Sequence, residues 1–153
     1  MLAVDTPALA SAGVTDPNIE SVPVGDGYLH TSPEFAMKRL LAAGYPDIYS
    51  ICRVFRAGER GRRHLREFTM IEWYRHDFGL DAIIADTLEL IRHALDRSAD
   101  ALPATVIDYR DAFIAHAGVD PLTDPVAALA RAAGADEALA ASLGDDRDAW
   151  LDL

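Results

Sequence analysis

The stretch VFRAGERGRRHLREFTMIEWYR, from Val54 to Arg75, decides the fold. Both of its ends are rich in aromatic and β-branched residues, as is typical of β-strands, whereas its middle holds two glycines and a run of arginines. We therefore predict a strand from Asp47 to Phe55, a loop from Arg56 to Leu65, and a further strand from Arg66 or Glu67 to Arg75. Two strands joined in this way most simply form an antiparallel hairpin.

The part of the chain before this hairpin predicts turns, one short strand and one helix. Residues 1–27 contain three prolines and three glycines, which favour extended segments and turns. A short strand is expected at Tyr28–His30. Thr31 or Ser32 can cap a helix in which Pro33 occupies the first turn and Glu34 completes a capping box with Thr31. We expect this helix to end at Gly44.

The part after the hairpin predicts helices. Apolar residues recur at helical spacing from Leu80 to Asp96, a shorter helix is expected from Asp108 to Ala117, and the alanine-rich tail from Val126 to Ser142 has helical composition. Strands come first and helices later. This order predicts the α+β class, with an antiparallel β-sheet and flanking helices, rather than a doubly wound parallel sheet. The 153 residues suffice for one domain, residues 1–153.

Composition excludes several classes of protein. The formal net charge is −11, which argues against general binding to nucleic acid or to anionic membranes. The single Cys52 can form no internal disulfide, so we expect a reducing, cytoplasmic compartment. No apolar run approaches the ~20 residues of a membrane span. The first 13 residues contain no basic residue, so we expect no signal peptide.

The last strand of the hairpin has two different faces, because side chains alternate along a strand. One face carries Ile71 and Trp73 together with Thr69 and Arg75, and we expect it to pack on helices. The other face combines an aromatic ring, a thioether, a carboxylate and a phenol: Phe68, Met70, Glu72 and Tyr74. The ring can stack on a planar base, while the carboxylate and the phenol can bind an amine. The alternative is a half-buried strand whose Glu72 reaches solvent.

The loop of the hairpin concentrates positive charge in an acidic protein. Six of the fourteen basic residues lie between Val54 and Arg75. Arginine presents a rigid fork of donors that matches phosphate, and His64 adds another donor, so the loop could hold a polyphosphate. The chain has no Walker-type glycine loop, so phosphate binding here would depend on side chains. The alternatives are a solvated surface loop and a loop that contacts RNA.

Three phrases resemble a known family. HTSPE-AMKRLLAAG, FRAGERGR-H and EFTM-EWYR are similar to the class II aminoacyl-tRNA synthetase core, and the strand–loop–strand resembles its motif 2, which binds ATP. Within that superfamily the chain is most similar to the lysyl-tRNA synthetase branch, and in particular to the elongation factor P–(R)-β-lysine ligase family. The later DYRDAFIAHAGVDPLT extends the resemblance over nearly the whole chain.

The resemblance implies a two-step reaction. ATP, with Mg²⁺, activates β-lysine (or lysine) as an adenylate and releases pyrophosphate. The β-lysyl group then passes to the ε-amine of a lysine on elongation factor P, with tRNA a less favoured acceptor. The resemblance also implies a homodimer for a full-length member.

The resemblance further implies roles for individual residues. Arg56 would be catalytic and hold the α-phosphate of ATP, His64 would lie near the terminal phosphates, and Phe68 would stack on adenine. The remaining positions divide into a nucleotide set, Ala57, Gly58, Glu59 and Leu65, and a set that contacts the lysyl substrate, Ser32, Pro33, Glu34, Glu72 and Tyr74. No metal ligand is assigned within this chain.

The sequence also departs from the family pattern. Gly58 stands where the motif has an acidic residue, and Leu65 replaces an asparagine. The stretch MLAVDTPAL resembles only the tail of motif 1, and no motif 3 appears before Leu153. We therefore expect about half of a catalytic domain that is inactive alone, with the Mg²⁺ ligands outside this chain.

Two other functions remain open at this point. One is a fragment of a lysyl-tRNA synthetase, although Glu72–Arg75 and the GERGR of the loop favour the ligase. The other is a truncated, non-catalytic paralogue that binds nucleotide or a partner. RNA binding by the arginine loop alone ranks below both.

Overall fold

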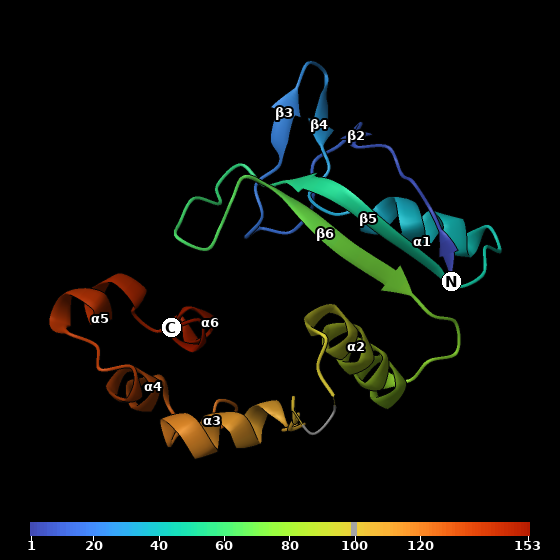
Figure 1. Ribbon diagram of the computed structural model, residues 1–153. Helices are drawn as coiled ribbons and strands as arrows, with labels where there is room; N and C mark the ends of the chain where they lie inside the picture. Colours follow the sequence, from blue (N-terminus) through green and yellow to red (C-terminus); the bar gives the residue numbers. More distant parts are fainter. Residues whose placement is uncertain (99–100) are drawn as a thin grey trace. The chain divides into compact units, whose positions relative to one another are not determined.

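The predicted hairpin is the central feature of the computed structural model, which describes residues 1–98 and 101–153. Strand β5 (Ile48–Phe55) pairs antiparallel with β6 (Glu67–Tyr74), and Ser50 lies opposite Glu72 (Figure 1). Strand β1 (Leu2–Ala3) joins the other edge of β5 in parallel. The predicted antiparallel hairpin is confirmed, and β1 adds a short parallel edge strand, so the sheet has the order β1-β5-β6.

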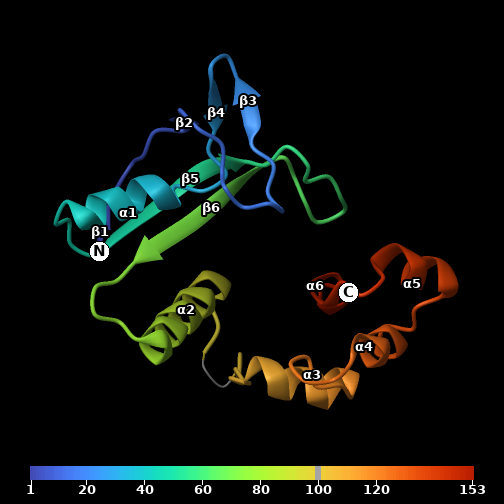
Figure 2. The same cartoon turned by 180° about the vertical axis from the view of Figure 1, so that it is seen from behind.

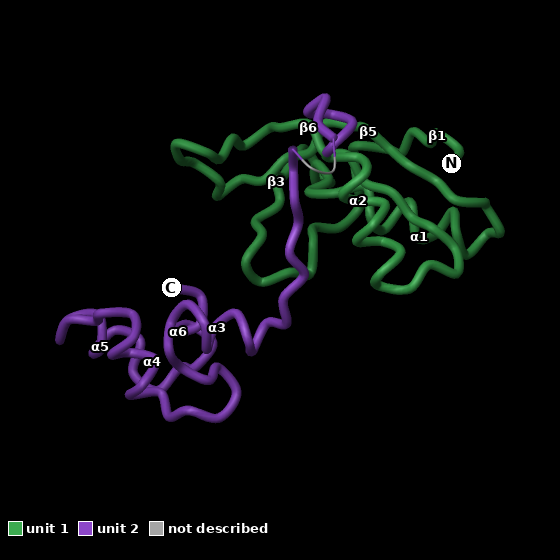
Figure 3. Tube along the Cα trace, turned by 60° about the horizontal axis from the view of Figure 1, so that its bottom comes forward, with its two compact units in different colours: residues 1–91 green, residues 92–153 purple. Residues whose placement is uncertain are grey.

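The chain divides into two compact units, residues 1–91 and 92–153, with the boundary inside helix α2 (Leu80–Leu95) (Figure 3). The single domain predicted for residues 1–153 stays a prediction. Of the helices in the described part of the chain, none is both long and apolar enough to cross a membrane.

A second, smaller sheet lies near the end of β5. It contains β2 (Leu9–Ala10), β3 (Val22–Val24) and β4 (Gly27–Leu29) in the antiparallel order β2-β4-β3 (Figure 2). Gly27 permits this order, because a Cβ there would lie 2.7 Å from the carbonyl oxygen of Ala10. The strand predicted at Tyr28–His30 thus starts and ends one residue earlier.

His30 follows directly after β4 and is hydrogen-bonded to β5 of the larger sheet. Its carbonyl oxygen accepts from the Phe55 amide at 3.0 Å, and its ring Nε2 lies 2.7 Å from the carbonyl oxygen of Arg53. Its own amide donates to the carbonyl oxygen of Ala8. His30 therefore ties the two sheets together and is itself buried.

Helix α1 (Glu34–Ala42) lies along one side of β5 in both views (Figures 1 and 2). The side chains of Met37, Ile48 and Val54 are fully buried. Ile48 and Val54 pair with Tyr74 and Phe68, so this core lies on the same face of the hairpin as the suspected ligand residues.

The opposite face of the hairpin is less covered than predicted. The exposed fraction of Ile71 is 43% and that of its cross-strand partner Ile51 is 61%. Trp73 does contact a helix, since its indole N–H donates to Asp86 of α2 at 3.1 Å. Ile71 lines a small pocket with Asp86 and Leu90 of α2, so this face does lie toward a helix, although Ile71 is only partly covered.

The predicted capping box with Thr31 is wrong, although the Ser32 side chain does bind the first amide of α1. The Glu34 amide donates to Oγ of Ser32 at 3.0 Å, while the Glu34 carboxylate pairs with Lys38 one turn further along the helix. Pro33 is the N-cap residue rather than part of the first turn. The helix ends before Gly44, whose φ of 88° is the left-handed conformation that glycine favours.

Arg75, directly after β6, is hydrogen-bonded to α2 and to the residue before β5. Its guanidinium donates to Asp86 at 2.9 Å and to Asp47 at 3.3 Å, and Asp47 also accepts from the His76 amide. The hydrogen bonds from Arg75 lower the pKa of Asp86. These contacts fix where the chain leaves the sheet and enters α2.

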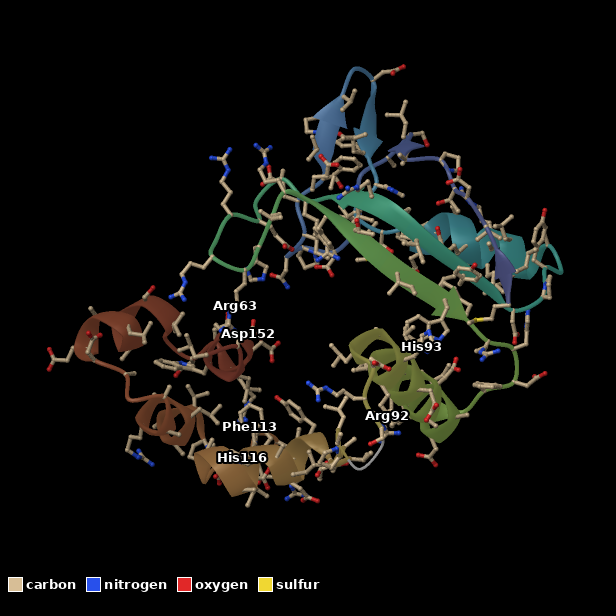
Figure 4. All side chains as sticks on the ribbon, in the orientation of Figure 1. Arg63, Arg92, His93, Phe113, His116 and Asp152 are labelled. Carbon is tan, nitrogen blue, oxygen red and sulfur yellow. The ribbon has the colours of Figure 1, made fainter. Side chains whose placement is uncertain are left out.

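The unit of residues 92–153 contains the short helices α3 (Tyr109–Ala117), α4 (Val126–Ala132), α5 (Glu137–Leu143) and α6 (Arg147–Leu151). Its core consists of Val119, Leu129 and Trp150, with Phe113 packed against them. Phe113 and His116 lie on α3 (Figure 4). Aspartate side chains accept from backbone amides at the starts of α3, α5 and α6, as N-caps do: Asp108, Asp136 and Asp146.

Replacement of Met37 tests the core between α1 and the hairpin. Met37→Ala should lower the free energy of unfolding by about 2–5 kcal/mol, because it removes a fully buried side chain and leaves a cavity. Leu80 is 76% exposed, so Leu80→Ala should change the free energy of unfolding by less than about 0.5 kcal/mol. Urea unfolding of both variants measures the difference. Equal effects would contradict the assigned core.

Candidate functional site

A pocket of about 720 Å³ lies in the unit of residues 1–91, on the buried face of the hairpin. Three parts of the chain line it: the segment 14–19, the approach to α1 from Thr31 to Phe35, and the hairpin residues Arg56, Met70 and Glu72. The pocket therefore brings together residues about forty positions apart, and two of the predicted substrate residues, Ser32 and Glu72, face each other in it.

Glu72 is held by two hydroxyl groups. Oγ of Ser32 donates to Oε2 at 2.6 Å, and the Tyr74 hydroxyl donates to Oε1 at 2.7 Å. Ser32 also accepts from the Glu34 amide, so its proton and one of its lone pairs are both used within the protein. The carboxylate thus has a fixed orientation and keeps lone pairs for a further donor, such as a ligand ammonium group.

Tyr74 stays protonated in this arrangement. Burial raises the pKa of its hydroxyl above the ordinary value, and so do its hydrogen bond to Glu72 and the charges of Glu72 and Glu34. At neutral pH the phenol therefore acts as a permanent donor to the carboxylate.

Arg56 also lines the pocket and is restrained by three contacts. Its Nη1 lies 3.1 Å from Oε1 of Glu59, its Nε donates to the carbonyl oxygen of Thr31 at 3.4 Å, and its guanidinium lies 5.2 Å from the centre of the Phe68 ring. A base between Arg56 and Phe68 would need about 7 Å, since carbon atoms in contact are about 3.5 Å apart. Arg56 must therefore move before a base can stack on this face of Phe68.

The other predicted substrate residues are placed differently. Pro33 is buried and fixes the backbone at the start of α1. Glu34 lines the pocket, but its carboxylate is paired with Lys38.

The remaining predicted nucleotide residues lie around Arg56 or out in the loop. Gly58 and Glu59 line a smaller pocket that also includes Arg56. The amide of Ala57 donates to the carbonyl oxygen of Glu20 at 2.8 Å. His64 and Leu65 are exposed and line none of these pockets, and Leu65 is 68% exposed.

The arginines of the loop are solvent-facing. Arg60, Arg62, Arg63 and Arg66 are exposed, and their side chains form no ion pair among the described residues; Figure 4 labels Arg63. Arg56 therefore differs from its neighbours in the loop, because it alone of these arginines lines the pockets.

The segment 14–19 is part of the site although no sequence pattern predicted it there. Thr15, Asp16 and Asn18 line the pocket, and Oδ1 of Asp16 accepts from the Asn18 amide at 2.8 Å. The Asp16-Pro17-Asn18 run predicts a turn, and nothing local in it indicates which part of the protein the turn will approach.

Comparison with known proteins places this site in context. The family model described as tRNA synthetases class II (D, K and N) matches residues 1–126. The elongation factor P–(R)-β-lysine ligase of Sodalis glossinidius is 42% identical over 166 residues, covering 100% of this chain and 49% of that protein. The ligase of the same name from Mannheimia succiniciproducens is 42% identical and covers 84% of this chain and 42% of its own length.

Solved structures agree with this family. The asparaginyl-tRNA synthetase of Pyrococcus horikoshii, complexed with asparaginyl-adenylate, matches with a TM-score of 0.54 and 25% identity, covering 65% of this chain and 24% of that one. The chain spans about half the length of the curated relatives it matches. The α+β class expected for a class II core is thereby confirmed.

The carboxylate of Glu72 should control the ionisation of Tyr74. Glu72→Gln should lower the pKa of the Tyr74 hydroxyl, because it removes the negative charge and the charged acceptor that disfavour the phenolate. The measurement is an absorbance titration at alkaline pH, with a Tyr74→Phe variant identifying this residue among the five tyrosines.

Glu67→Gln is the matched control, because Glu67 lies on the same strand and points to the other face. It should leave the titration unchanged. If Tyr74 already titrates with ordinary tyrosines, near a pKa of about 10, the bond to Glu72 is absent in solution.

Proposed function

Because the chain belongs to the class II tRNA synthetases (D, K and N), we propose that it takes part in the ATP-dependent activation of (R)-β-lysine and its transfer to elongation factor P. One observation supports this proposal above the others. A carboxylate held by two hydroxyl donors and a restrained arginine line the same pocket.

This pair of groups suits an amino acid with an extra amine and an anionic co-substrate. Glu72 is oriented to accept from one ammonium group, and Glu34, once it leaves Lys38, offers a second carboxylate. Arg56 offers a forked donor for phosphate. A β-lysine whose amines bind Glu72 and Glu34 would direct its own carboxylate toward Arg56. Its carboxylate would then lie near the α-phosphate that it has to attack.

The chemistry then proceeds in two balanced steps. A carboxylate oxygen of β-lysine attacks the α-phosphorus of ATP, the bond to the β-phosphate oxygen breaks, and pyrophosphate leaves. Arg56 would stabilise the charge that develops on the α-phosphate oxygens. In the second step the neutral ε-amine of the acceptor lysine attacks the acyl carbon, an amide bond forms, and AMP leaves.

Binding of ATP would also rearrange Arg56. Its present partners, Glu59 and the Phe68 ring, occupy the guanidinium and the ring face that a nucleotide would use. We propose that phosphate replaces Glu59 as the partner of Arg56, which frees Phe68 to stack on adenine. This exchange keeps the arginine paired in both states.

Mg²⁺ normally accompanies ATP through its phosphates. Within residues 1–98 and 101–153, no group of three or more His, Cys, Asp and Glu side chains could hold a metal ion. These residues do not fit a protein-held Mg²⁺, so no step of the proposed reaction is derived through one. A homodimer is a proposal that rests on the likeness to the ligase family, and a cytoplasmic site of action is a proposal that rests on the single cysteine.

Exchange between pyrophosphate and ATP tests the first step. Because this chain alone is expected to be inactive, the assay uses the chain joined to the second half of a family member's catalytic domain. In this fusion we expect exchange that requires (R)-β-lysine, and we expect Arg56→Ala to reduce it by about 10²-fold or more, the usual cost of removing a group that stabilises transition-state charge. Arg53→Ala is the matched control, because Arg53 is an exposed arginine of β5. Its exchange rate should equal that of the unaltered fusion. Equal losses in both variants would contradict the role of Arg56.

The acceptor separates the ligase from its nearest alternative. With the same fusion, ATP and (R)-β-lysine present, elongation factor P should gain one β-lysyl group, detected by intact-protein mass spectrometry, whereas tRNA(Lys) should not be charged. Charging of tRNA(Lys) would favour a synthetase activity instead. ATP binding with neither exchange nor transfer would support the non-catalytic nucleotide-binding alternative.

A further inference from the structure

Gly58 lies beside a carboxylate from a distant part of the chain, that of Glu20. Its backbone does not adopt the left-handed conformation that would require glycine. A Cβ at this position would lie 3.4 Å from Oε2 of Glu20 and would meet no other non-neighbouring atom of the described residues within 4 Å. A Cβ here would make ordinary van der Waals contact with the Glu20 carboxylate, so position 58 lies directly beside that carboxylate.

The position of Glu20 is fixed by its own backbone. Its carbonyl oxygen accepts from the Ala57 amide at 2.8 Å, and Ala57 directly follows Arg56. This bond attaches the end of the segment 14–20 to the end of β5. Glu20 is thus held beside Arg56 without its side chain being used for the attachment.

The carboxylate of Glu20 has no partner within the described part of the chain. The nearby Glu59 differs in this respect, because it forms an ion pair with Arg56. Arg56 makes its other hydrogen bond to Thr31. Glu20 is exposed, so its carboxylate is solvated and open to a ligand at this edge of the pocket.

Glu20 faces a pocket of about 420 Å³ that continues the candidate site. This smaller pocket shares Pro17, Asn18, Ile19 and Arg56 with the larger one, and Glu20, Gly58 and Glu59 complete its lining. Arg56 contacts the Phe68 ring and also lines the smaller pocket. An adenylate with its phosphate at Arg56 and its base over Phe68 would therefore have an edge of that base toward the smaller pocket.

We propose that Glu20 is a nucleotide-specificity residue that accepts a hydrogen bond from the exocyclic amine of adenine. This inference rests on the proposed nucleotide-dependent function. Adenine presents that amine as its hydrogen-bond donor, and a carboxylate without a partner is a strong acceptor. Purine riboside triphosphate has the same size and phosphates but lacks the amine, so it isolates this one contact.

The test is equilibrium binding of ATP and of purine riboside triphosphate to the full chain, measured by calorimetry. The unaltered chain should bind ATP about tenfold more tightly, as expected for a hydrogen bond to a charged group. Glu20→Ala should bind the two nucleotides equally, by weakening ATP alone. Equal weakening of both nucleotides would overturn the inference, because it would mean that the segment 14–20 had been disrupted.

A second-site variant provides the decisive comparison. Gly58→Asp in the Glu20→Ala background puts a carboxylate close to the place that Oε2 of Glu20 occupied, and it should restore the preference for ATP. Gly61→Asp in the same background adds the same charge in the outer part of the loop and should not restore it. Restoration by both variants, or by neither, would overturn the inference.

The outcomes also separate this inference from the proposed function. Binding of neither nucleotide by the unaltered chain would overturn both. Tight ATP binding without preference over purine riboside triphosphate would overturn the role of Glu20 and leave the proposed function standing.

Discussion

The candidate site depends on one carboxylate that is bonded from two directions. Ser32 precedes α1, and Tyr74 is the last residue of β6, yet both donate to Glu72. The same serine oxygen receives the first amide of α1, so the start of the helix, the strand and the carboxylate share one set of hydrogen bonds. Because Met37, Ile48 and Val54 are buried on this face of the hairpin, the network rests on a packed core and not on a loop.

Charge is arranged in a simple way around this network. The pocket lining contains the carboxylates of Glu34 and Glu72 beside the Ser32 hydroxyl, and also the guanidinium of Arg56, which contacts the Phe68 ring. Under the proposed function, a cationic amino acid would approach the carboxylates and an anionic nucleotide would approach the guanidinium. The exposed arginines of the loop add positive charge outside the pocket, where solvent screens it. The net charge of −11 says little about such a local division.

Local sequence patterns predicted much of the fold and part of the site. Alternation along β6 correctly grouped Phe68, Met70, Glu72 and Tyr74, and helical spacing predicted α2 to within one residue. Alternation alone could not tell which face is buried, because both faces carry large apolar residues. The parallel pairing of β1 and the approach of the segment 14–19 to the pocket join distant parts of the chain, so they depend on tertiary contacts that leave no periodic signal. The capping box failed because Lys38 offered Glu34 a charged partner.

The two attachments of the N-terminal segment have a consequence for how this site can vary. This segment is residues 20–30. At one end the carbonyl oxygen of Glu20 accepts from the Ala57 amide, and at the other end His30 is hydrogen-bonded to Arg53 and Phe55 of β5. The turn at residues 14–19 lies outside these attachments. Insertions or exchanges in that turn would therefore reshape the wall of the pocket while the sheet keeps its register. Such a turn offers a natural place for related proteins to diverge in substrate choice, and for engineered variants to acquire new ones.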